Sequence, residues 1–233
     1  MLPLASAGGR AGVIVRTGVE GLDRLLGGGI EERSLTEFYS PSVRIVGLLY
    51  HRIAVLASAK GRTLAVHVQD FGGLDPYMLR SMARRIGADW RTVEENLMVA
   101  RAFKLEDALD LLSRASREES EFALVFDPYL HVDWREAWTA TRLTQALREL
   151  AADRTVVSFN RCSLDGRGWS PLGGTYHAHS IHAVVRLDPR PRGLVRATLV
   201  KHPSRPQASE WLTVGELGGA SPWEGLPRLS EWL

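Results

Sequence analysis

Three parts of this sequence carry side chains of types that can do chemistry. Asp127 directly follows the continuous apolar run Phe122–Phe126, and a carboxylate at the end of a buried strand can cap the following loop. A segment from position 161 to 174 combines arginines and a tryptophan with glycines, a composition suited to contacting nucleic acid. His177, His179 and His182 lie close together in the sequence, and imidazole is a common metal ligand.

The histidine group does not predict a metal site. His177 and His179 share a face only if their segment is a strand, and no acidic residue lies near them in the sequence. No Ser/His/Asp or Cys/His arrangement stands out either. We therefore expect no catalytic residue of these classes, no metal site and no cofactor.

The composition is that of a soluble globular protein. The chain has 233 residues, of which 45% are hydrophobic and 24% charged, and its formal net charge is +2. This length suits one large domain, and the longest apolar runs are far shorter than the roughly 20 residues of a membrane helix. Cys162 is the single cysteine, which excludes an internal disulfide and a cysteine-cluster zinc site. We expect a cytoplasmic protein with no membrane partner.

The elements that must position these residues alternate between strands and helices. Apolar patterning predicts strands over 34–39, 63–68, 97–100, 122–126 and 155–159, and helices over 45–59, 76–86, 105–115 and 135–152. An earlier short helix ends near Leu26, and a capping box of Thr17 and Glu20 is predicted at its start. Asp75 is predicted to cap the helix over 76–86, with Pro76 at its first position. Alternation of this kind indicates an α/β fold with a mostly parallel sheet and helices on both faces.

The C-terminal part follows a different pattern. Two β-rich stretches, 181–187 and 194–200, flank a Pro- and Gly-containing turn, which predicts an antiparallel hairpin at one edge of the sheet. We divide the chain into a flexible leader over 1–12, a core over 13–214 and a tail over 215–233. The tail contains Trp223 and Trp232, and we favour a strap docked on the core over a free partner-binding peptide.

An ordered set of motifs resembles the RecA/RadA superfamily. The stretch TGVEGLDRLLGGGIEERSLTEFYSP resembles the entry to that ATPase core, and it is followed by QDFGGLDPYML, FALVFD, VVSFN, PLGGTYHAHSIHAVVRL and VKHPSRPQA. In its length without an N-terminal domain and in its KHPSRP element, the sequence is most similar to archaeal RadB paralogues. The resemblance covers about residues 13 to 214 and implies a RecA-like P-loop NTPase core.

The phosphate-binding loop of this family is degenerate here. A working loop has the form G-x-x-x-x-G-K-[ST] because its glycines, lysine and hydroxyl hold phosphates and magnesium. The aligned segment reads Ser40-Pro41-Ser42-Val43-Arg44-Ile45-Val46-Gly47. Ser40 and Ile45 replace the glycines, Val46 replaces the lysine and Gly47 replaces the hydroxyl residue. Arg44 points differently from the lost lysine, so we do not expect it to restore the site.

A second loss is independent of the first. The resemblance places Phe71 where the family has the acidic residue that polarises the attacking water, whereas Asp127 matches the aspartate that orders magnesium. With lysine, hydroxyl and general base all absent, ATP hydrolysis has no electrostatic machinery left. We expect a pseudo-ATPase that acts by binding.

The resemblance also points to residues for binding. It implies two loops that face DNA, over 129–135 and 161–174, and cations that reach a neighbouring subunit. The candidate DNA or partner contacts are therefore Arg135, Arg161, Arg167, Trp169, Lys201 and Arg205. For Trp169, packing on the domain is the alternative interpretation. For Lys201 and Arg205, the alternative is surface ion pairing.

Three functions follow as hypotheses. The leading one is a RadB-like accessory factor in homologous recombination or DNA repair that binds single-stranded DNA, the main RadA-type recombinase, or both. A second is a scaffold related to the KaiC or archaellum-motor ATPases, and a third is an ATP-binding protein with an atypical loop. Homo- or hetero-oligomers are compatible with all three.

Overall fold

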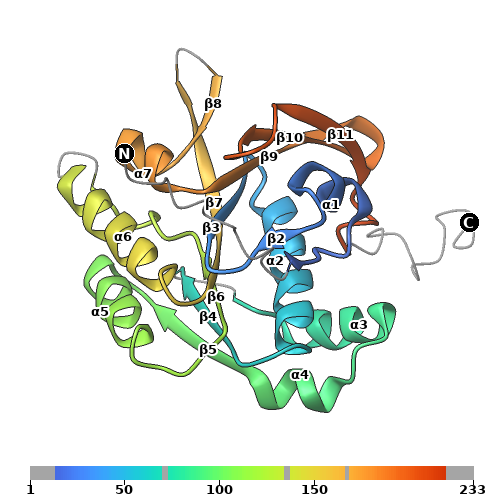
Figure 1. Ribbon diagram of the computed structural model, residues 1–233, viewed down its shortest axis with the longest axis horizontal. Helices are drawn as coiled ribbons and strands as arrows, with labels where there is room; N and C mark the ends of the chain where they lie inside the picture. The colour runs from blue at the N-terminus through green and yellow to red at the C-terminus, as the bar shows by residue number, and fades with distance from the viewer. Residues whose placement is uncertain (1–13, 70–72, 134–136, 166–167, 219–233) are drawn as a thin grey trace, which may run out of the picture.

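A mixed, mostly parallel sheet forms the centre of the molecule. The computed structural model describes residues 14–69, 73–133, 137–165 and 168–218, and its nine-stranded sheet has the order β11-β10-β9-β3-β7-β6-β4-β5, with β8 paired to β7 (Figure 1). Strands β9, β3, β7, β6, β4 and β5 run parallel, whereas β10 and β11 are antiparallel to their neighbours. The bounds are β3 Leu35–Ser40, β4 Thr63–Val68, β5 Leu97–Ala102, β6 Phe122–Phe126, β7 Thr155–Asp165, β8 Gly168–Pro171, β9 Ala183–Arg190, β10 Leu194–Lys201 and β11 Ala208–Thr213.

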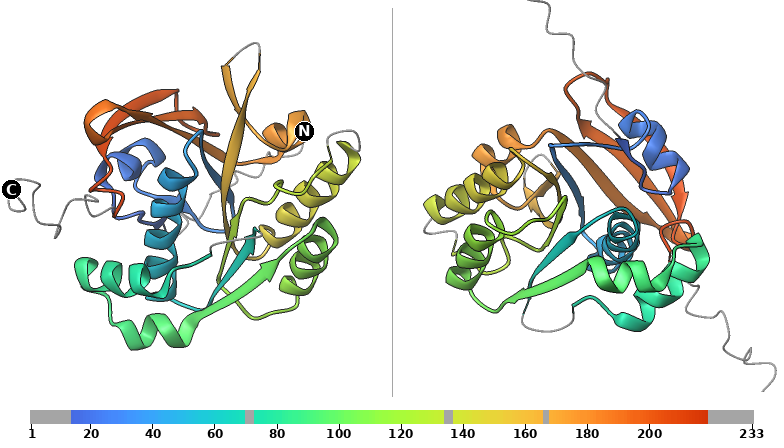
Figure 2. Two further views of the ribbon diagram at one scale, coloured as in Figure 1. Left: turned by 180° about the vertical axis from the view of Figure 1, so that it is seen from behind. Right: turned by 60° about the horizontal axis from the view of Figure 1, so that its bottom comes forward.

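Helices cover both faces of this sheet, as Figure 2 shows from two sides. One face packs against α1 Glu20–Leu26, α2 Val43–Ser58, α3 Pro76–Ile86 and α4 Trp90–Asn96. The opposite face packs against α5 Leu105–Ala115 and α6 Ala137–Leu150, with the short α7 Gly174–Ser180 beside α6. Each layer buries its own apolar cluster because the side chains of a strand alternate between the two faces. The predicted α/β class, with its parallel sheet and helices on both faces, is confirmed.

The C-terminal extension is larger than predicted. The expected hairpin is confirmed, since β9 and β10 pair through the turn at Pro191–Gly193. The further strand β11 continues the antiparallel edge. A separate pair, β1 Ile14–Val15 and β2 Ile30–Glu31, lies beside α1. The segment 208–213 lacks a regular apolar alternation, so its pairing with β10 was not visible in the sequence.

Two local predictions at helix starts had different outcomes. Asp75 caps α3 as predicted, because its side chain accepts hydrogen bonds from the amides of Tyr77 and Met78. The capping box at α1 is wrong: Thr17 donates its backbone and hydroxyl protons to Asp23 at 2.7 and 2.8 Å instead. Gly18 is the cause, because its φ of 70° turns the chain before the helix begins.

The segment 161–174, which the resemblance implies is a loop that faces DNA, is largely a hairpin. β7 continues beyond the predicted end at Phe159 to Asp165 and pairs antiparallel with β8. Helix α4 was also not predicted. The leader 1–12, and positions 219–233 of the tail, lie outside the described residues. No helix in the described ranges is long and apolar enough to cross a membrane.

Candidate functional site

The segment that aligns with the phosphate loop has become part of a helix. β3 ends at Ser40 and α2 begins at Val43, so only two residues connect them. The amides of Ile45 and Val46 both donate to the Ser42 carbonyl and do not face an open loop. Val46 is 0% exposed and belongs to the apolar cluster under α2. The position of the family's lysine therefore faces the protein interior.

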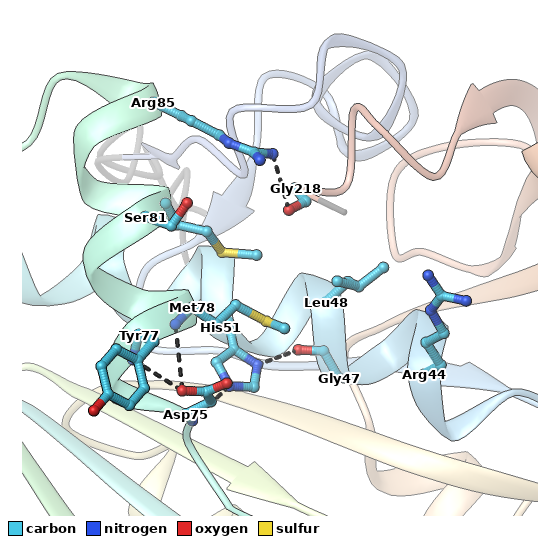
Figure 3. A pocket seen from close by; sticks show the side chains of 11 residues that line it. Arg44, Gly47, Leu48, His51, Asp75, Tyr77, Met78, Ser81, Arg85 and Gly218 are labelled. Carbon is cyan, nitrogen blue, oxygen red and sulfur yellow. Dashed lines mark hydrogen bonds between the residues drawn. The ribbon is translucent and has the colours of Figure 1, made fainter. Parts of the chain in front are cut away.

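A pocket of about 530 Å³ lies beside this segment, between α2 and α3 (Figure 3). Its polar centre is His51, whose Nδ1–H donates to the Gly47 carbonyl at 2.7 Å while Nε2 accepts the Asp75 amide proton at 2.9 Å. Both nitrogens are thus used by a neutral imidazole, and burial lowers the pKa of His51. The remaining lining residues are Arg44, Leu48, Tyr77, Met78, Ser81, Met82, Arg85 and Gly218.

Asp127, the match to the magnesium-ordering aspartate, is occupied by an internal cation. It is 1% exposed, and its Oδ2 accepts hydrogen bonds from Nε of Arg161 at 2.8 Å and from Nε2 of Gln69 at 2.7 Å. Burial raises the pKa of Asp127, while Gln69 and Arg161 oppose that rise. The Arg161 guanidinium therefore neutralises this carboxylate through Oδ2, while the buried Oδ1 has no hydrogen-bond partner among the described residues.

The same contact changes the interpretation of Arg161. The resemblance implies a loop that faces DNA at this position, whereas the structure places Arg161 in β7 with its Nε directed at Asp127. Its side chain is 35% exposed. Parallel strands end at one edge of the sheet, and this brings positions 127 and 161 together across 34 residues of sequence. Arg161 is therefore an internal ion-pair partner of Asp127.

The three histidines lie in different surroundings and form no metal site. His177 is buried, and its Nε2 is 2.6 Å from Oε2 of Glu37. Nε2 of His182 lies within hydrogen-bond distance of Oε2 of Glu31, at 2.7 Å, and His179 lies on the exposed surface of α7. Among the described residues no group of three or more His, Cys, Asp or Glu side chains could hold a metal ion. α7 is helical, so His177 and His179, two positions apart, do not share a face.

His177 belongs instead to a fully buried hydrogen-bond chain. Thr144 donates its hydroxyl proton to the Ala140 carbonyl, so the Tyr129 hydroxyl must donate to Thr144, at 2.8 Å. Tyr129 then accepts from Nδ1–H of His177, at 2.7 Å. This chain ties β3 to α6, α7 and the segment after β6.

Further partners complete this chain from β7. The Glu37 carboxylate also accepts from Ser158 and Asn160, and Asn160 donates to the Leu172 carbonyl at 2.7 Å. Within the described residues, Oε1 of Glu37 and Oδ1 of Asn160 have no hydrogen-bond partner, so the network is held together through Oε2 of Glu37 and the side-chain amide of Asn160. It fixes the base of the β7–β8 hairpin relative to α7.

Trp169 and Lys201, two candidate contacts that lie far apart in the sequence, line one pocket. This hairpin pocket has a volume of about 650 Å³ and lies between β8, α7, β9 and β10. Trp169 is 40% exposed, and its carbonyl accepts the Tyr39 hydroxyl proton at 3.3 Å. The residues that line this hairpin pocket are Tyr39, Trp169, Ser170, Pro171, Gly174, Thr175, Ala178, His179, Val184, Arg186, Val200 and Lys201.

Lys201 and Arg205 both cap helices of this chain. Nζ of Lys201 donates to the Ala178 and His179 carbonyls near the end of α7, at 3.0 and 2.9 Å. Nη1 of Arg205 donates to the Arg24 carbonyl near the end of α1. The two cations therefore serve different helix ends, where the dipole favours positive charge. The other candidates, Phe71, Arg135 and Arg167, lie outside the described residues.

Two aromatic–arginine pairs on α6 and α7 are not among the residues predicted from the sequence. The Arg142 guanidinium lies 5.5 Å from the ring centroid of the exposed Trp138. Arg148 donates to the hydroxyl of the half-exposed Tyr176 at 3.0 Å. The spacing of Trp138 and Arg142 at i and i+4 is a helical neighbour signal that was readable in the sequence.

Comparisons with known proteins agree with this architecture. The Rad51 family model matches residues 10–163. The DNA repair and recombination protein RadB of Halobacterium salinarum is 30% identical over 229 residues, covering 88% of this chain and 94% of RadB. The DNA repair protein RAD51 of Saccharomyces cerevisiae is 32% identical over 120 residues, which cover 48% of this chain and 30% of the yeast protein.

A solved structure shares the fold. The crystal structure of the RadB recombinase superposes with a TM-score of 0.74 at 23% identity, covering 88% of this chain and 98% of that one. The family match and the nearly full-length RadB match agree with the sheet order and with the motifs read from the sequence. The chain therefore belongs to the Rad51 family, among its RadB-like recombination and repair proteins.

Proposed function

We propose that this protein is an accessory factor in recombination or repair that does not hydrolyse ATP and acts by binding single-stranded DNA, the main recombinase, or both. One observation carries the proposal: the residue at the lysine position, Val46, is buried in the core. A phosphate group bound at α2 would meet neither the lysine charge nor a hydroxyl at Gly47. The Asp127–Arg161 ion pair supports the same conclusion, because the carboxylate already has a cation.

The DNA part of the proposal rests on the face formed by the β7–β8 hairpin, α7 and α6. Figure 1 shows these three elements next to one another. The exposed aromatic rings there are Trp169, Tyr176 and Trp138, and Arg142 and Arg148 lie beside two of them. Exposed rings accompanied by guanidinium groups form stacking platforms for unpaired bases. The relatives named as DNA repair and recombination proteins support this partner class.

A pair of measurements tests the two parts separately. For nucleotide, thermal unfolding is followed with Mg-ATP at millimolar concentration, together with phosphate release. A ligand at about 100 times its dissociation constant stabilises by roughly 2.7 kcal/mol, so binding would be visible. We expect no shift and no release. A clear shift would show that the site binds nucleotide, and phosphate release would overturn the pseudo-ATPase assignment.

For the partner, fluorescence anisotropy measures binding of a labelled single strand at several salt concentrations, and co-purification tests a RadA-type recombinase. Phosphate contacts predict that log K falls linearly with log salt. We expect salt-dependent strand binding, recombinase capture, or both. Failure of both would refute the accessory role.

A further inference from the structure

The pocket between α2 and α3, which we call the α2–α3 pocket, has a wall suited to an aromatic side chain. Its volume of about 530 Å³ lies within the range of pockets that accept a bound group, roughly 300–1,000 Å³. Leu48 of α2 and Met78 and Met82 of α3 form the apolar part of this wall. Methionine side chains adapt to the shape of a partner and make favourable sulfur contacts with aromatic rings.

The same pocket carries positive charge that no internal partner neutralises. Figure 3 shows Arg44 and Arg85 on opposite sides of the pocket. Both residues are exposed, and neither makes an ion pair within the described ranges. Asp75, the one acidic residue of the lining, accepts hydrogen bonds from the first amides of α3. The pocket therefore suits a ligand that joins an aromatic ring to a carboxylate.

The C-terminal segment leaves the core at the rim of this pocket. Leu217 is 0% exposed and belongs to the apolar cluster under α2. Gly218 lines the pocket, and its carbonyl accepts a hydrogen bond from Nη1 of Arg85 at 3.4 Å. The φ of Gly218 is 101°, and a Cβ there would lie 2.6 Å from Cε of Met82. Glycine lets the chain pass this close to the methionine, so the residues after Gly218 start beside the pocket.

Those residues carry the matching chemistry. Positions 219–224 read Gly-Ala-Ser-Pro-Trp-Glu, so Trp223 is followed directly by a carboxylate, that of Glu224. Trp223 comes five residues after Gly218, and five residues extend over up to about 17 Å. That reach is longer than a pocket of this volume is wide. An aromatic ring and a carboxylate are thus tethered next to a site that suits both.

We propose that Trp223 docks in the α2–α3 pocket of its own chain, with its ring against Met78 and the Glu224 carboxylate at Arg44. Arg85 already holds the start of the segment through the Gly218 carbonyl, which leaves Arg44, on the other side of the pocket, for the carboxylate. The docked segment closes the pocket beside the start of α2 to other ligands. This contact lies within the chain and does not rest on the DNA-binding role proposed above.

The short tether favours this contact strongly. Short flexible linkers hold two groups at an effective concentration in the millimolar range. A contact whose dissociation constant is about 0.1 mM between separate molecules is then about 90% occupied within one chain. Trp232 comes fourteen residues after Gly218, and its longer tether gives a lower effective concentration. Trp223 is therefore the better placed of the two tryptophans.

The first experiment measures the mobility of the Trp223 indole in the 233-residue chain. The indole N–H signals of ¹⁵N-labelled protein are assigned with Trp223→Phe and Trp232→Phe, and their relaxation is recorded. A docked indole should have an order parameter near about 0.85, whereas a free one stays below about 0.6. Met78→Gln, which makes the wall polar at similar length, should lower the value for Trp223. Circular dichroism of each variant checks the fold.

The second experiment titrates a labelled peptide of residues 219–233 into variants of the same chain, followed by anisotropy. Wild type should bind the peptide about tenfold more weakly than Trp223→Ala, because about 90% of its pockets hold their own Trp223. Adding Arg44→Glu to Trp223→Ala should weaken peptide binding about fivefold, and a peptide with Glu224→Arg should recover that loss. Arg84→Glu is the matched control, because Arg84 is exposed on α3 but does not line the pocket; it should change binding by less than about twofold.

Four results would overturn the proposal. A Trp223 indole that is mobile in wild type would show that the ring does not dock. Equal peptide binding by wild type and Trp223→Ala would show that the pocket is not filled from within the chain. Opening of the pocket by Trp232→Ala in place of Trp223→Ala would identify the other tryptophan as the occupant. Indole order that rises with protein concentration would show that the segment docks on a second copy. Because the charge exchange leaves the apolar wall intact, it tests the contact even if Met78→Gln does not fold.

Discussion

The buried hydrogen-bond chain through Tyr129 makes a sharp prediction about stability. Tyr129→Phe removes one hydroxyl that donates to Thr144 and accepts from Nδ1–H of His177, all in the interior. The His177 donor is then buried without an acceptor, which costs about 1–3 kcal/mol, and the bond to Thr144 is also lost. We expect the free energy of unfolding to fall by about 2–3 kcal/mol. For a domain of this size that is a decrease in Tm of about 4–12 °C.

The assay is guanidinium denaturation followed by circular dichroism, with Tyr176→Phe as the matched control. Tyr176→Phe also removes a hydroxyl hydrogen bond, the one from Arg148, but Tyr176 lies on the surface. The free energy of unfolding of this variant should therefore stay within about 0.5 kcal/mol of the wild-type value. An unchanged m-value would show that the variants unfold from an equally compact state. If Tyr129→Phe were no more destabilising than Tyr176→Phe, the proton accounting for this network would be wrong.

Three other predictions follow from the site. Burial lowers the pKa of His51 below its unfolded value of about 6.5. The contribution of His51 to stability is therefore present above about pH 6.5 and is lost as the pH falls toward the folded pKa. His51→Gln should flatten the curve of stability against pH between about pH 7 and 5.5, and an unaltered slope would exclude His51 as the source of this pH dependence. Arg161→Gln should cost about 2–3 kcal/mol, less than a fully buried pair because Arg161 is about one-third exposed. In a double-mutant cycle, Asp127→Asn should recover at least about 1 kcal/mol of that loss, whereas purely additive effects would argue against the pair. Val46→Lys should destabilise the protein by several kcal/mol without restoring Mg-ATP binding, because the position is buried; a stable variant that binds ATP would contradict this placement.

Local sequence patterns predicted most of the parallel sheet. The run Phe122–Phe126 forms β6, and the Asp75-Pro76 pair begins α3 where capping and proline preference place it. These predictions succeeded because apolar periodicity and helix capping act over a few residues. Local patterns gave wrong or missing predictions where the conformation depends on contacts with other segments. β11 acquires its strand conformation by pairing with β10, and at α1 the turn at Gly18 and the hydrogen bonds from Thr17 to Asp23 replace the predicted capping box.

The sequence by itself determined that positions 46 and 47 carry neither a positive charge nor a hydroxyl, because Val46 and Gly47 lack both in any fold. Only the tertiary structure decided which side chains meet at the edge of the sheet. Arg161 reaches Asp127 because the ends of β6 and β7 lie side by side, and Trp169 and Lys201 meet in one pocket because β8 folds back over α7 and β10. Contacts between residues so distant in the chain depend on strand order and register, which local propensities do not encode.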